Sequence, residues 1–442
     1  MGIGGAGMSA LALIARRRGV PVSGCDSDPS GAKDVAELGA TVHQGHDPAH
    51  VTGARAVVVT AAVPKDHPEL NAARAAHVPV VPRKEALAQL IAGGTTVAIA
   101  GTHGKTTTTV MTTLALTAAG LEPTGLAGGR VNEWGGNARL AGDRIFVVEA
   151  DEYDQAFLTL HPTYAVVNNV EADHLECYGT VDALEDAFVE FAGRAKVAFL
   201  GANDAGARRV GSRLKNRHWF FGTDEAELTI DLIEQYPAET RARLTFPDGK
   251  AVAVRLAVPG LHNLRNAAGA LGVVWAMDAD LEPALRALQE YGGLGRRFER
   301  LGEHGGVMLV DDYAHHHSEL AATLAAARQA FPGRRLVAVF QPHLFSRTAA
   351  HGAAMGQALA AADLVIVSEI YAAREQPMPG VSGRQVADAA KAAGARTLFE
   401  PAREKLSRAV LEAVQPGDVV LTLGAGDITK VGRELAEWLR AG

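Results

Sequence analysis

The chain has 442 residues, of which 48% are hydrophobic and 21% are charged, and its formal net charge is −7. A single hydrophobic core seldom serves more than about 250–300 residues, so this length predicts about three domains. The acidic balance argues against a nucleic-acid surface, which needs clustered basic side chains, and no apolar run reaches the roughly 18 residues of a membrane-spanning helix. Cys25 and Cys177 lack metal-ligand spacing and suit a reducing, cytoplasmic compartment.

Short apolar runs alternate with stretches of helical spacing along most of the chain, and this alternation predicts doubly wound α/β folds. Helical spacing is clear at residues 183–192 and 319–330. Residues 225–258 instead predict short antiparallel strands, with a turn at Pro247-Asp248-Gly249. The predicted buried parallel strands are Val57–Thr60, Thr96–Ala100, Ile145–Glu149, Tyr164–Asn168, Arg335–Phe340, Leu364–Ser368 and Val419–Leu423.

Two glycine-rich connections divide the chain into three predicted domains, at residues 1–92, 93–291 and 292–442. Gly93-Gly94 precedes a new strand, and residues 292–295 form a flexible link. We expect Rossmann-like first and third domains. The central domain is expected to be a P-loop ATPase-like α/β fold with a small antiparallel portion.

The first glycine-rich segment, Gly2–Gly7, is followed by a predicted strand at Val20–Gly24 and then by Asp26. This order is typical of dinucleotide-binding domains, in which glycines approach a pyrophosphate and an acidic residue meets a ribose. Taken alone, it favours a nicotinamide-dependent oxidoreductase.

The second glycine-rich segment, Gly101–Thr108, follows a buried strand and opens a helix. Its glycines let the backbone wrap a phosphate, Lys105 supplies a positive charge for the β and γ phosphates, and the Thr106 hydroxyl can bind Mg²⁺. A P-loop usually has glycine at the position of Ile99, so this loop is a shortened variant. The alternative is a turn that only caps a helix, but Gly-Lys-Thr between a strand and a helix favours phosphate binding.

Acidic residues follow two predicted strands, at Glu149–Glu152 and Asn169–His174. Hard oxygen ligands at the carboxyl edge of a parallel sheet, beside a phosphate loop, suit metal-assisted phosphoryl transfer. Glu149 and His174 stand where strands end, which favours the metal interpretation. Asp151 and Glu152 fit solvated loop charges equally well.

Taken together and in their order along the chain, these motifs resemble those of the Mur ligases over nearly the whole chain. The resemblance is closest to the branch that joins L-alanine to UDP-N-acetylmuramic acid. The segments that carry it are Gly2–Ser9, Gly101–Thr107, Glu149–Asp154, Asn168–His174, Leu261–Asn266, Gly293–Glu299, Asp311–His316 and Gln341–Arg347.

The resemblance implies that the first domain binds the UDP-sugar, the second ATP with Mg²⁺, and the third the amino acid, in a monomer or homodimer. The lactyl carboxylate of the sugar would be activated as an acyl phosphate, which the amine then attacks. Charge neutralisation and a base for the amine are therefore expected to matter most.

By resemblance, the N-terminal glycines bind the UDP pyrophosphate and Asp26 is a nearby polar partner. Glu149 and Thr106 are implied ligands of the first Mg²⁺, and His174 is an implied ligand of a second ion. The implied UDP-sugar residues are Gly4, Gly5, Ala6, Gly7, Met8, Ser9 and Asp26. The implied nucleotide residues are Gly101, Thr102, His103, Gly104, Lys105, Thr106, Thr107, Asn263, Asn266, Arg296 and Asp312.

Four further roles follow from the resemblance. Arg296 reaches the phosphates from the interdomain hinge, and Asp312 and His315 approach the nucleotide from the third domain. His343 and Arg347 form the amino-acid pocket, where Arg347 would pair with the substrate carboxylate. The alternative for residues 315–317 is a surface histidine run, which the preceding strand disfavours for His315 alone.

The sequence departs from the family at several positions. Later-acting members carry a modified lysine about 15 residues after the strand-end histidine, whereas this chain has Phe188 and Val189 there and Lys196 lies too far along. This matches the alanine-adding branch. His317 replaces a usual proline, and Leu344-Phe345 replaces an arginine–tyrosine pair of some members.

In the family a β-strand precedes the first glycine turn, whereas this sequence begins on the turn itself at Met1. A doubly wound domain without that strand would leave buried backbone groups unpaired. We therefore expect roughly 10–20 further native residues that encode it. In-frame upstream codons test this expectation.

Three alternatives leave some motifs unused. An oxidoreductase has no use for Gly101–Thr106, and a P-loop switch protein gives Arg296 and Asp312–His315 no role. A relative that attaches a whole peptide to the same sugar would need a wider third-domain pocket. Gly424–Asp427 could approach a nucleotide, but a tight turn capped by Asp427 is the favoured interpretation.

Overall fold

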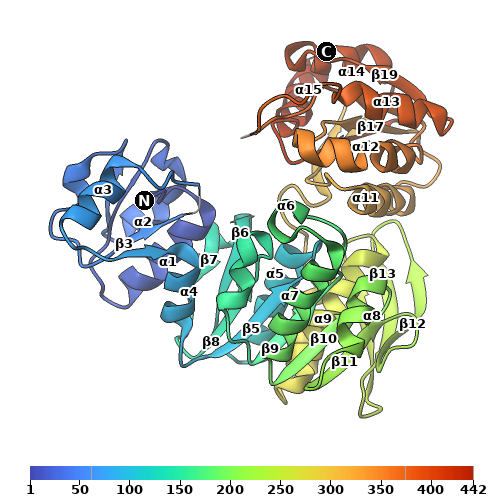
Figure 1. Ribbon diagram of the computed structural model, residues 1–442. Coiled ribbons are helices and arrows are strands. Elements are labelled where there is room, and N and C mark those ends of the chain that lie inside the picture. Colours follow the sequence, from blue (N-terminus) through green and yellow to red (C-terminus); the bar gives the residue numbers. More distant parts are fainter. Residues whose placement is uncertain (61, 374, 442) are drawn as a thin grey trace. The chain divides into compact units, whose positions relative to one another are not determined.

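The computed structural model describes residues 1–60, 62–373 and 375–441 (Figure 1). They form two compact units. The first unit comprises Met1–Leu232, Ala242–Arg255 and Arg265–Glu290. The second comprises Ile233–Arg241, Leu256–Leu264 and the chain from Tyr291 onward. Within the described residues, no helix combines the length and hydropathy needed to cross a bilayer.

The N-terminal part of the first unit contains two separate two-stranded parallel sheets. The Gly2 and Ile3 N–H groups donate to the carbonyl of Cys25 in one sheet, and the Met1 ammonium donates to that of Val58 in the other. The first residues therefore lie between the sheets. The strands are β1 (Ser23–Asp26), β2 (Thr41–Gln44), β3 (Val57–Val59) and β4 (Val80–Pro82); the helices are α1 (Ala6–Arg17), α2 (Lys33–Glu37), α3 (Pro68–Ala75) and α4 (Arg83–Ile91).

The larger part of the first unit is built on a ten-stranded sheet with the order β14-β13-β12-β11-β10-β9-β5-β8-β6-β7. Strands β6, β8, β5, β9, β10, β11 and β12 pair in parallel, and β7 is antiparallel. The bounds are β5 (Thr95–Ala100), β6 (Pro123–Val131), β7 (Gly136–Arg139), β8 (Ile145–Glu149), β9 (Tyr164–Val167), β10 (Val197–Gly201), β11 (Arg217–Gly222), β12 (Leu228–Gln235), β13 (Thr240–Thr245) and β14 (Ala251–Leu256).

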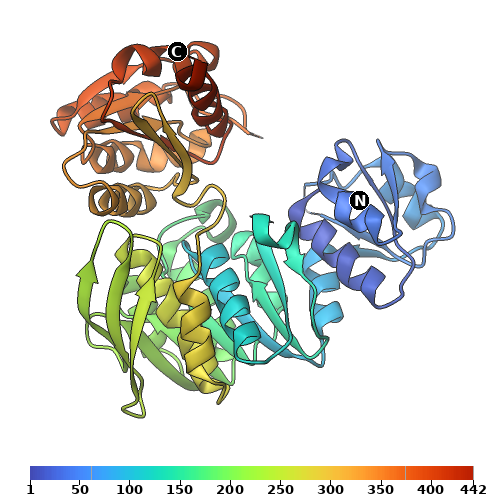
Figure 2. The same cartoon turned by 180° about the vertical axis from the view of Figure 1, so that it is seen from behind.

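Helices cover both faces of this sheet. Figure 1 shows α7 (Val181–Gly193) and α8 (Ala205–Ser212) on one face, and Figure 2 shows α9 (Leu261–Ala276) on the other. Helix α5 (Lys105–Ala118) packs against α10 (Leu281–Gln289). Threonine is a weak helix former, and α5 contains several buried threonines. The hydroxyl groups of Thr112 and Thr113 are satisfied inside the helix, because they donate to carbonyls one turn back at 2.7 and 2.8 Å.

Helix α1 joins the N-terminal part to the ten-stranded sheet by packing against β6 and β7. The buried Ser9 hydroxyl donates to Asn137 Oδ1 at 3.0 Å across this contact. Lys84 at the start of α4 adds an ion pair with Asp154 at 3.0 Å. The N-terminal glycine turn is therefore held against the central sheet.

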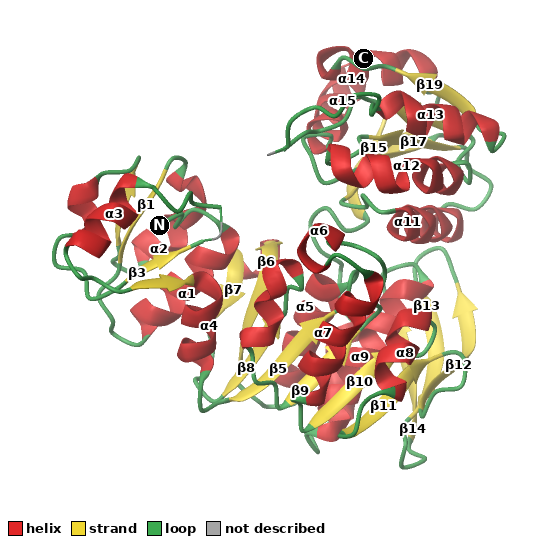
Figure 3. Ribbon diagram, viewed as in Figure 1, coloured by secondary structure: helices red, strands yellow, loops and turns green. Residues whose placement is uncertain are grey.

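The second unit contains a six-stranded sheet with the order β15-β16-β20-β17-β18-β19, in which only the β15 edge pairs antiparallel (Figure 3). Alternate side chains point to opposite faces. Thus Ala338 and Phe340 pack with α11, α12 and α13, whereas Val337 and Val339 pack with α14 and α15. The bounds are β15 (Glu299–His304), β16 (Val307–Asp312), α11 (His317–Ala330), β17 (Leu336–Phe340), α12 (Phe345–Leu359), β18 (Leu364–Val367), α13 (Gly383–Ala392), β19 (Arg396–Phe399), α14 (Arg403–Ala413), β20 (Val419–Leu423) and α15 (Thr429–Ala441).

The predicted α/β fold class is confirmed, and β8 and β20 have the predicted bounds. The turn at Gly249 also forms, since the Gly249 N–H donates to the Phe246 carbonyl at 2.9 Å. The strand predicted at Val20–Gly24 is wrong in position. Its ladder begins only at Ser23, because Pro21 has no N–H to donate.

Candidate active site

The phosphate loop of the first unit connects β5 to α5 and is held by residues that follow β9. The His103 N–H donates to Asn169 Oδ1 at 2.8 Å, and the Thr102 N–H donates to the Asn169 carbonyl at 3.1 Å. Asn168 Nδ2 donates to the His103 carbonyl at 3.1 Å. Because β5 and β9 are neighbouring parallel strands, the loop and these asparagines meet at one sheet edge.

Two glycines of this loop are required by both conformation and space. Gly101 and Gly104 have φ values of +126° and +78°, which other residues rarely adopt. A Cβ atom on Gly104 would lie 2.6 Å from Asn266 Oδ1, and one on Gly101 would lie 3.0 Å from the Asn168 backbone nitrogen. The loop therefore passes too close to its neighbours to carry side chains at these positions.

Lys105, the first residue of α5, forms a buried ion pair. Its Nζ lies 2.8 and 2.7 Å from the two carboxylate oxygens of Glu152 and donates to the Gly101 carbonyl at 2.7 Å. Burial opposes the charge, but the carboxylates of Glu152, Asp151 and Glu149 outweigh it and raise the pKa of Lys105. Glu152 is thus no solvated loop charge, since only 2% of the residue is exposed.

Thr106 and Glu149 supply the oxygen donors that suit Mg²⁺. Glu149 ends β8 in register with Ile99 of β5, so its carboxylate lies beside the phosphate loop. Its Oε2 accepts a hydrogen bond of 2.6 Å from the Gly128 N–H. A hydroxyl, a carboxylate and the oxygens of a nucleotide form a donor set that fits Mg²⁺, and these two residues would hold it.

His174 lies further along the chain, after β9, with a left-handed backbone at φ 54°. Its ring packs edge-on against Tyr153 at 5.3 Å, and its Nδ1 lies 3.4 Å from Glu176 Oε1. Within the part of the chain that the structure describes, no metal-holding group of three His, Cys, Asp or Glu side chains contains Glu149 or His174. The second-ion role of His174 stays a prediction.

The N-terminal glycine turn has the same design as the phosphate loop. The Gly4 N–H donates to Asp26 Oδ2 at 2.9 Å, so the strand-end Asp26 supports the turn directly. A Cβ atom on Gly7 would lie 2.7 Å from Nη1 of Arg83, the first residue of α4. A helix N-terminus and a guanidinium group therefore converge where the resemblance implies a pyrophosphate.

The remaining predicted residues of the first region lie at different depths. Gly5 is exposed at the start of α1, whereas Met8 and Ser9 are buried within that helix. Met8 packs with Leu11 and Ala86. Gly4 and Gly7 are half-buried, and sugar contacts by Met8 and Ser9 stay predictions.

Asn263 and Asn266 occupy the first turns of α9, three residues apart on one helix face. Asn266 lies against Gly104 of the phosphate loop, since a Cβ atom on Gly104 would lie only 2.6 Å from Asn266 Oδ1. The Asn263 amide donates to the Pro259 carbonyl at 2.7 Å. Asn266 thus belongs to the phosphate-loop region, and the adenine role of both residues stays a prediction.

In the second unit, Arg296 is held by the turn that follows β20. Its Nη2 donates to the carbonyls of Gly424 and Gly426 at 2.6 and 3.2 Å, and its guanidinium lies 4.8 Å from the Tyr313 ring centre. Its Nε lies 3.5 Å from the buried Asp311 carboxylate. The Gly424–Gly426 turn therefore does more than cap a helix, because its carbonyls bind Arg296, a residue predicted to contact the phosphates.

Asp312, the last residue of β16, is buried and accepts two backbone hydrogen bonds. The Phe298 N–H donates to Oδ2 and the Ala314 N–H donates to Oδ1, both at 2.7 Å. Burial raises the pKa of Asp312 to about 6, although Arg297 and these N–H groups oppose the shift. The carboxylate is thus committed to shaping the loop that carries His315.

His315 is a neutral imidazole with a defined tautomer. Its Nδ1 lies 2.9 Å from the Tyr313 carbonyl, which can only accept, so the ring donates there and Nε2 keeps its lone pair. Burial lowers the pKa of His315 to about 4, with Glu319 opposing this shift and Arg347 adding to it. The ring is therefore uncharged at neutral pH.

His343 and Arg347 lie beside this histidine. The His315 and His343 rings meet at 6.1 Å, and His343 stacks on Tyr371 at 5.8 Å. Arg347 lies in the first turn of α12 and only 8% of the residue is exposed. Leu344 precedes α12 with φ 70°, a strained value for a non-glycine residue that is typical of binding sites.

Four contributors escaped the sequence reasoning: Asn168 and Asn169 as loop supports, Glu152 as the Lys105 partner, and Arg83 beside Gly7. Asn168 ends a predicted strand and Asn169 directly follows it, which was an available signal. Arg83 has no local signal, because it lies 76 positions beyond Gly7 and meets it only through the fold.

Comparison with known proteins covers nearly the whole chain. Residues 1–95 match the Mur ligase family catalytic domain, residues 99–274 the Mur ligase middle domain, and residues 296–426 the Mur ligase glutamate ligase domain. The UDP-N-acetylmuramate–L-alanine ligase of Kineococcus radiotolerans is 45% identical over 448 residues, covering 99% of this chain and 95% of that protein. The enzyme of the same name from Thermobifida fusca is 42% identical, covering 99% and 96%.

The crystal structure of UDP-N-acetylmuramate-alanine ligase from Thermotoga maritima superposes with a TM-score of 0.84 at 29% identity, covering 100% of this chain and 98% of that one. A murein peptide ligase from Psychrobacter arcticus has the same fold, with a TM-score of 0.72 at 23% identity.

Proposed function

Because the chain belongs to the Mur ligase family, whose members use ATP, we propose that it joins L-alanine to UDP-N-acetylmuramic acid in cytoplasmic peptidoglycan precursor synthesis. The observation that carries the proposal is identity of 41–45% over 97–100% of the chain with relatives that bear this activity in their name. The phosphate loop with its buried Lys105 supplies the matching chemistry.

The proposed reaction has two steps. A lactyl carboxylate oxygen attacks the γ-phosphorus of ATP, so that an acyl phosphate forms and ADP leaves. The amine nitrogen of alanine then attacks the acyl carbon, and phosphate leaves with the carboxylate oxygen that attacked. One proton is lost from the amine. Both steps bring anions together, so cations decide the rate.

Lys105 and the N–H groups of the phosphate loop neutralise the developing charge on the transferred phosphoryl group. Mg²⁺, bound through Thr106 and Glu149, would supply further charge neutralisation. Glu152 holds the Lys105 ammonium in place and keeps it charged within a buried site. The lysine is therefore prepared before the nucleotide arrives, which lowers the cost of ordering it.

On the amino-acid side, a nearly buried Arg347 can take the substrate carboxylate with two parallel N–H···O bonds. His315 offers an Nε2 lone pair on a ring that its Tyr313 contact holds in one tautomer. Because the ring is uncharged at neutral pH, it can accept a hydrogen bond from the incoming amine. This orients the nitrogen without placing a second cation beside it.

An isotope experiment tests both the function and the acyl-phosphate route. The purified protein is incubated with ATP, Mg²⁺, L-alanine and UDP-N-acetylmuramic acid that carries ¹⁸O in the lactyl carboxylate. We expect the alanyl product by mass spectrometry, with one ¹⁸O atom in each phosphate released. Product without ¹⁸O transfer would refute the acyl phosphate. Product only when a peptide replaces alanine would identify a peptide-adding relative.

A further inference from the structure

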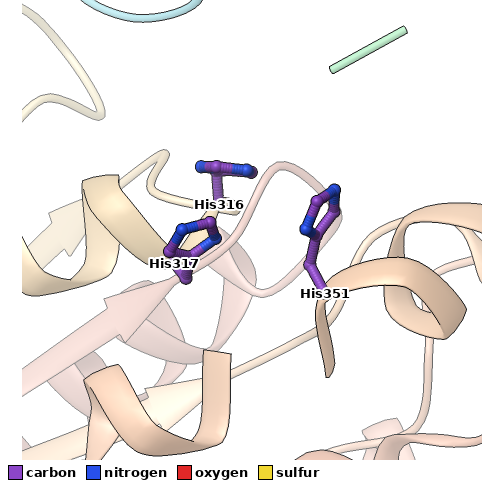
Figure 4. A group of neighbouring side chains, drawn as sticks. All are labelled: His316, His317 and His351. Carbon is purple, nitrogen blue, oxygen red and sulfur yellow. The ribbon is translucent and has the colours of Figure 1, made fainter. Parts of the chain in front are cut away.

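Three histidines gather in the second unit, outside the residues assigned to substrates. His316 and His317 lie at the start of α11, and His351 lies in the second turn of α12. One ring nitrogen of each lies within 4.8 Å of the other two. Figure 4 shows the three rings side by side, the first two from consecutive residues and the third from the neighbouring helix.

The rings are close but do not form one stack. Their centres are 4.1 Å apart for His316 and His317, 5.0 Å for His316 and His351, and 5.7 Å for His317 and His351. The first pair is inclined at 44° and the second at 68°. His316 is only 1% exposed, and His317 Nδ1 is buried without a hydrogen-bond partner among the described residues.

The donor chemistry defines the class of ion. Three uncharged imidazoles suit Zn²⁺ and similar divalent transition ions, not Mg²⁺, which prefers oxygen. Metal–nitrogen bonds of about 2.0–2.1 Å in a tetrahedron place nitrogens about 3.3 Å apart, so small ring rotations would close the site around an ion. The fourth position would hold water.

Neighbouring polar groups support such an ion. The His316 side chain accepts the Glu319 N–H in the capping box of α11, and its Nδ1 lies 2.7 Å from the Ser318 hydroxyl. Binding of a metal at Nε2 would move the ring proton to Nδ1, where the Ser318 hydroxyl can accept it. The Glu319 carboxylate accepts hydrogen bonds from the His315 and His316 N–H groups at 3.0 and 3.2 Å. Its negative charge offsets the positive end of α11.

A comparable group of side chains in the first unit is already occupied. The buried Glu69 carboxylate accepts from Cys25 Sγ at 3.2 and 3.3 Å, from the Asp47 N–H at 3.0 Å, and lies 3.1 and 2.8 Å from Nδ1 of His46 and His50. Burial and Glu69 raise the pKa of the Cys25 thiol to about 12. That group is a satisfied hydrogen-bond network.

We propose that His316, His317 and His351 form a binding site for one divalent transition ion of the Zn²⁺ class. The ion joins the start of α11 to α12. His315 directly precedes the first of these helices, and Arg347 lies one turn before His351 on the second. A bound ion therefore fixes the spacing of the two elements that carry the proposed amine and carboxylate contacts.

The test uses Co²⁺ as a spectroscopic probe of the full, untagged chain, because nitrogen-bound Co²⁺ in a four-coordinate site absorbs visible light strongly. We expect one Co²⁺ per chain, displacement by an equivalent of Zn²⁺, and no displacement by excess Mg²⁺. Zn²⁺ should also raise the Tm, because a ligand that binds only the folded state stabilises it.

Two variants localise the ion. His317→Pro removes one ligand at the first helical position, where proline is well tolerated, and the extended His316 backbone at φ −118°, ψ 153° accepts a following proline. His351→Ala removes another ligand from the neighbouring helix. Each variant should weaken Co²⁺ binding at least about 100-fold and abolish the Zn²⁺-dependent Tm shift. The matched control is His161→Ala, an exposed histidine of the first unit, which should bind normally.

Three results would overturn the proposal. They are the absence of stoichiometric Co²⁺ binding, unchanged binding in both His317→Pro and His351→Ala, and loss of binding in His50→Ala alone. The last result would place the ion at the Glu69 network instead. Unchanged circular dichroism in His317→Pro separates ligand loss from unfolding.

Discussion

The two cations that the proposed function places at the phosphates, Lys105 and Arg296, are held in different ways. Lys105 in the first unit contacts a full negative charge, the Glu152 carboxylate, in a buried pair. Arg296 in the second unit donates to two carbonyls of the Gly424–Gly426 turn and lies against the ring of Tyr313, and its nearest carboxylate, that of Asp311, stays 3.5 Å away. Both cations are therefore ordered without substrate, but by partners of unequal strength.

This difference suggests that Lys105 is fixed before the nucleotide binds, whereas Arg296 can move to a phosphate when the nucleotide arrives. A buried carboxylate keeps Lys105 charged and in place, at the risk of a stranded charge if either partner is lost. Carbonyls and a carboxylate at 3.5 Å hold Arg296 more weakly than the two short contacts hold Lys105, so an anionic phosphate can compete for its guanidinium. We therefore expect the Lys105 pair to matter for both stability and chemistry, and residues of the second unit to matter mainly for substrate binding.

The largest effect is expected from Lys105→Ala. Loss of the ammonium should lower kcat by at least about 1000-fold and destabilise the fold by about 3 kcal/mol, because Glu152 stays buried without its cation. ADP release and urea denaturation measure the two effects. The control is Lys105→Ala with Glu152→Gln, which should recover most of the stability and none of the activity. If the double variant stays as unstable as Lys105→Ala, Glu152 is not the source of the instability.

Arg347→Lys tests the proposed contact between Arg347 and the carboxylate of the amino acid. Lysine keeps the charge but loses the planar fork, so we expect a loss of about 2–3 kcal/mol in alanine recognition, roughly 30- to 150-fold in kcat/KM. The KM for ATP should stay constant, as measured by coupled ADP release. An equal rise in both KM values would refute a specific carboxylate contact.

The pH dependence of stability should separate Asp312 from His315. The pKa of Asp312 is raised to about 6, so its contribution to stability is lost as pH rises from about 4 to 6. The pKa of His315 is lowered to about 4, so its contribution is lost as pH falls from about 6.5 to 4. In the wild type the two slopes largely cancel.

Substitution should therefore tilt the profile in opposite directions, by up to about 3 kcal/mol each. Between pH 4 and 6, the unfolding free energy of Asp312→Asn should rise more steeply with pH than that of the wild type. That of His315→Gln should rise less steeply. Urea denaturation at several pH values measures these slopes, and parallel profiles would contradict the assigned shifts.

Asn169→Ala tests the support of the phosphate loop and should have the smallest effect. It leaves the His103 N–H without its side-chain acceptor, which should cost about 1–2 kcal/mol of stability and raise the KM for ATP several-fold. The matched control is Asn71→Ala, an exposed asparagine of α3, which should leave the KM unchanged. An unchanged KM in Asn169→Ala would show that the loop is rigid without this contact.

Sequence reasoning located elements where the signal is local. The phosphate loop, its strand and its helix are contiguous, so Gly101–Thr106 predicted this strand–loop–helix structure. Glu149 was placed at a strand end because the strand is recognisable, and its metal role stays a prediction. Glu152 was left undecided between a metal ligand and a solvated charge, because nothing in its neighbours reveals that it is buried against Lys105.

Contacts between distant segments escaped prediction for a physical reason. Arg296 was expected at phosphates, yet its present partners lie 128 and 130 positions away in a turn that was interpreted mainly as a helix cap. The strand predicted at Val20–Gly24 lies instead at Ser23–Asp26, and Pro21, which has no N–H to donate, stays outside the ladder. Periodicity locates elements, whereas partners depend on how the elements pack.

ADP release by the purified protein with ATP, Mg²⁺ and UDP-N-acetylmuramic acid, measured with and without L-alanine, tests the proposed ligase activity most directly. We expect release that depends on alanine and disappears in Lys105→Ala. Release at the same rate without alanine and without the UDP-sugar would contradict it and identify a nucleotide hydrolase.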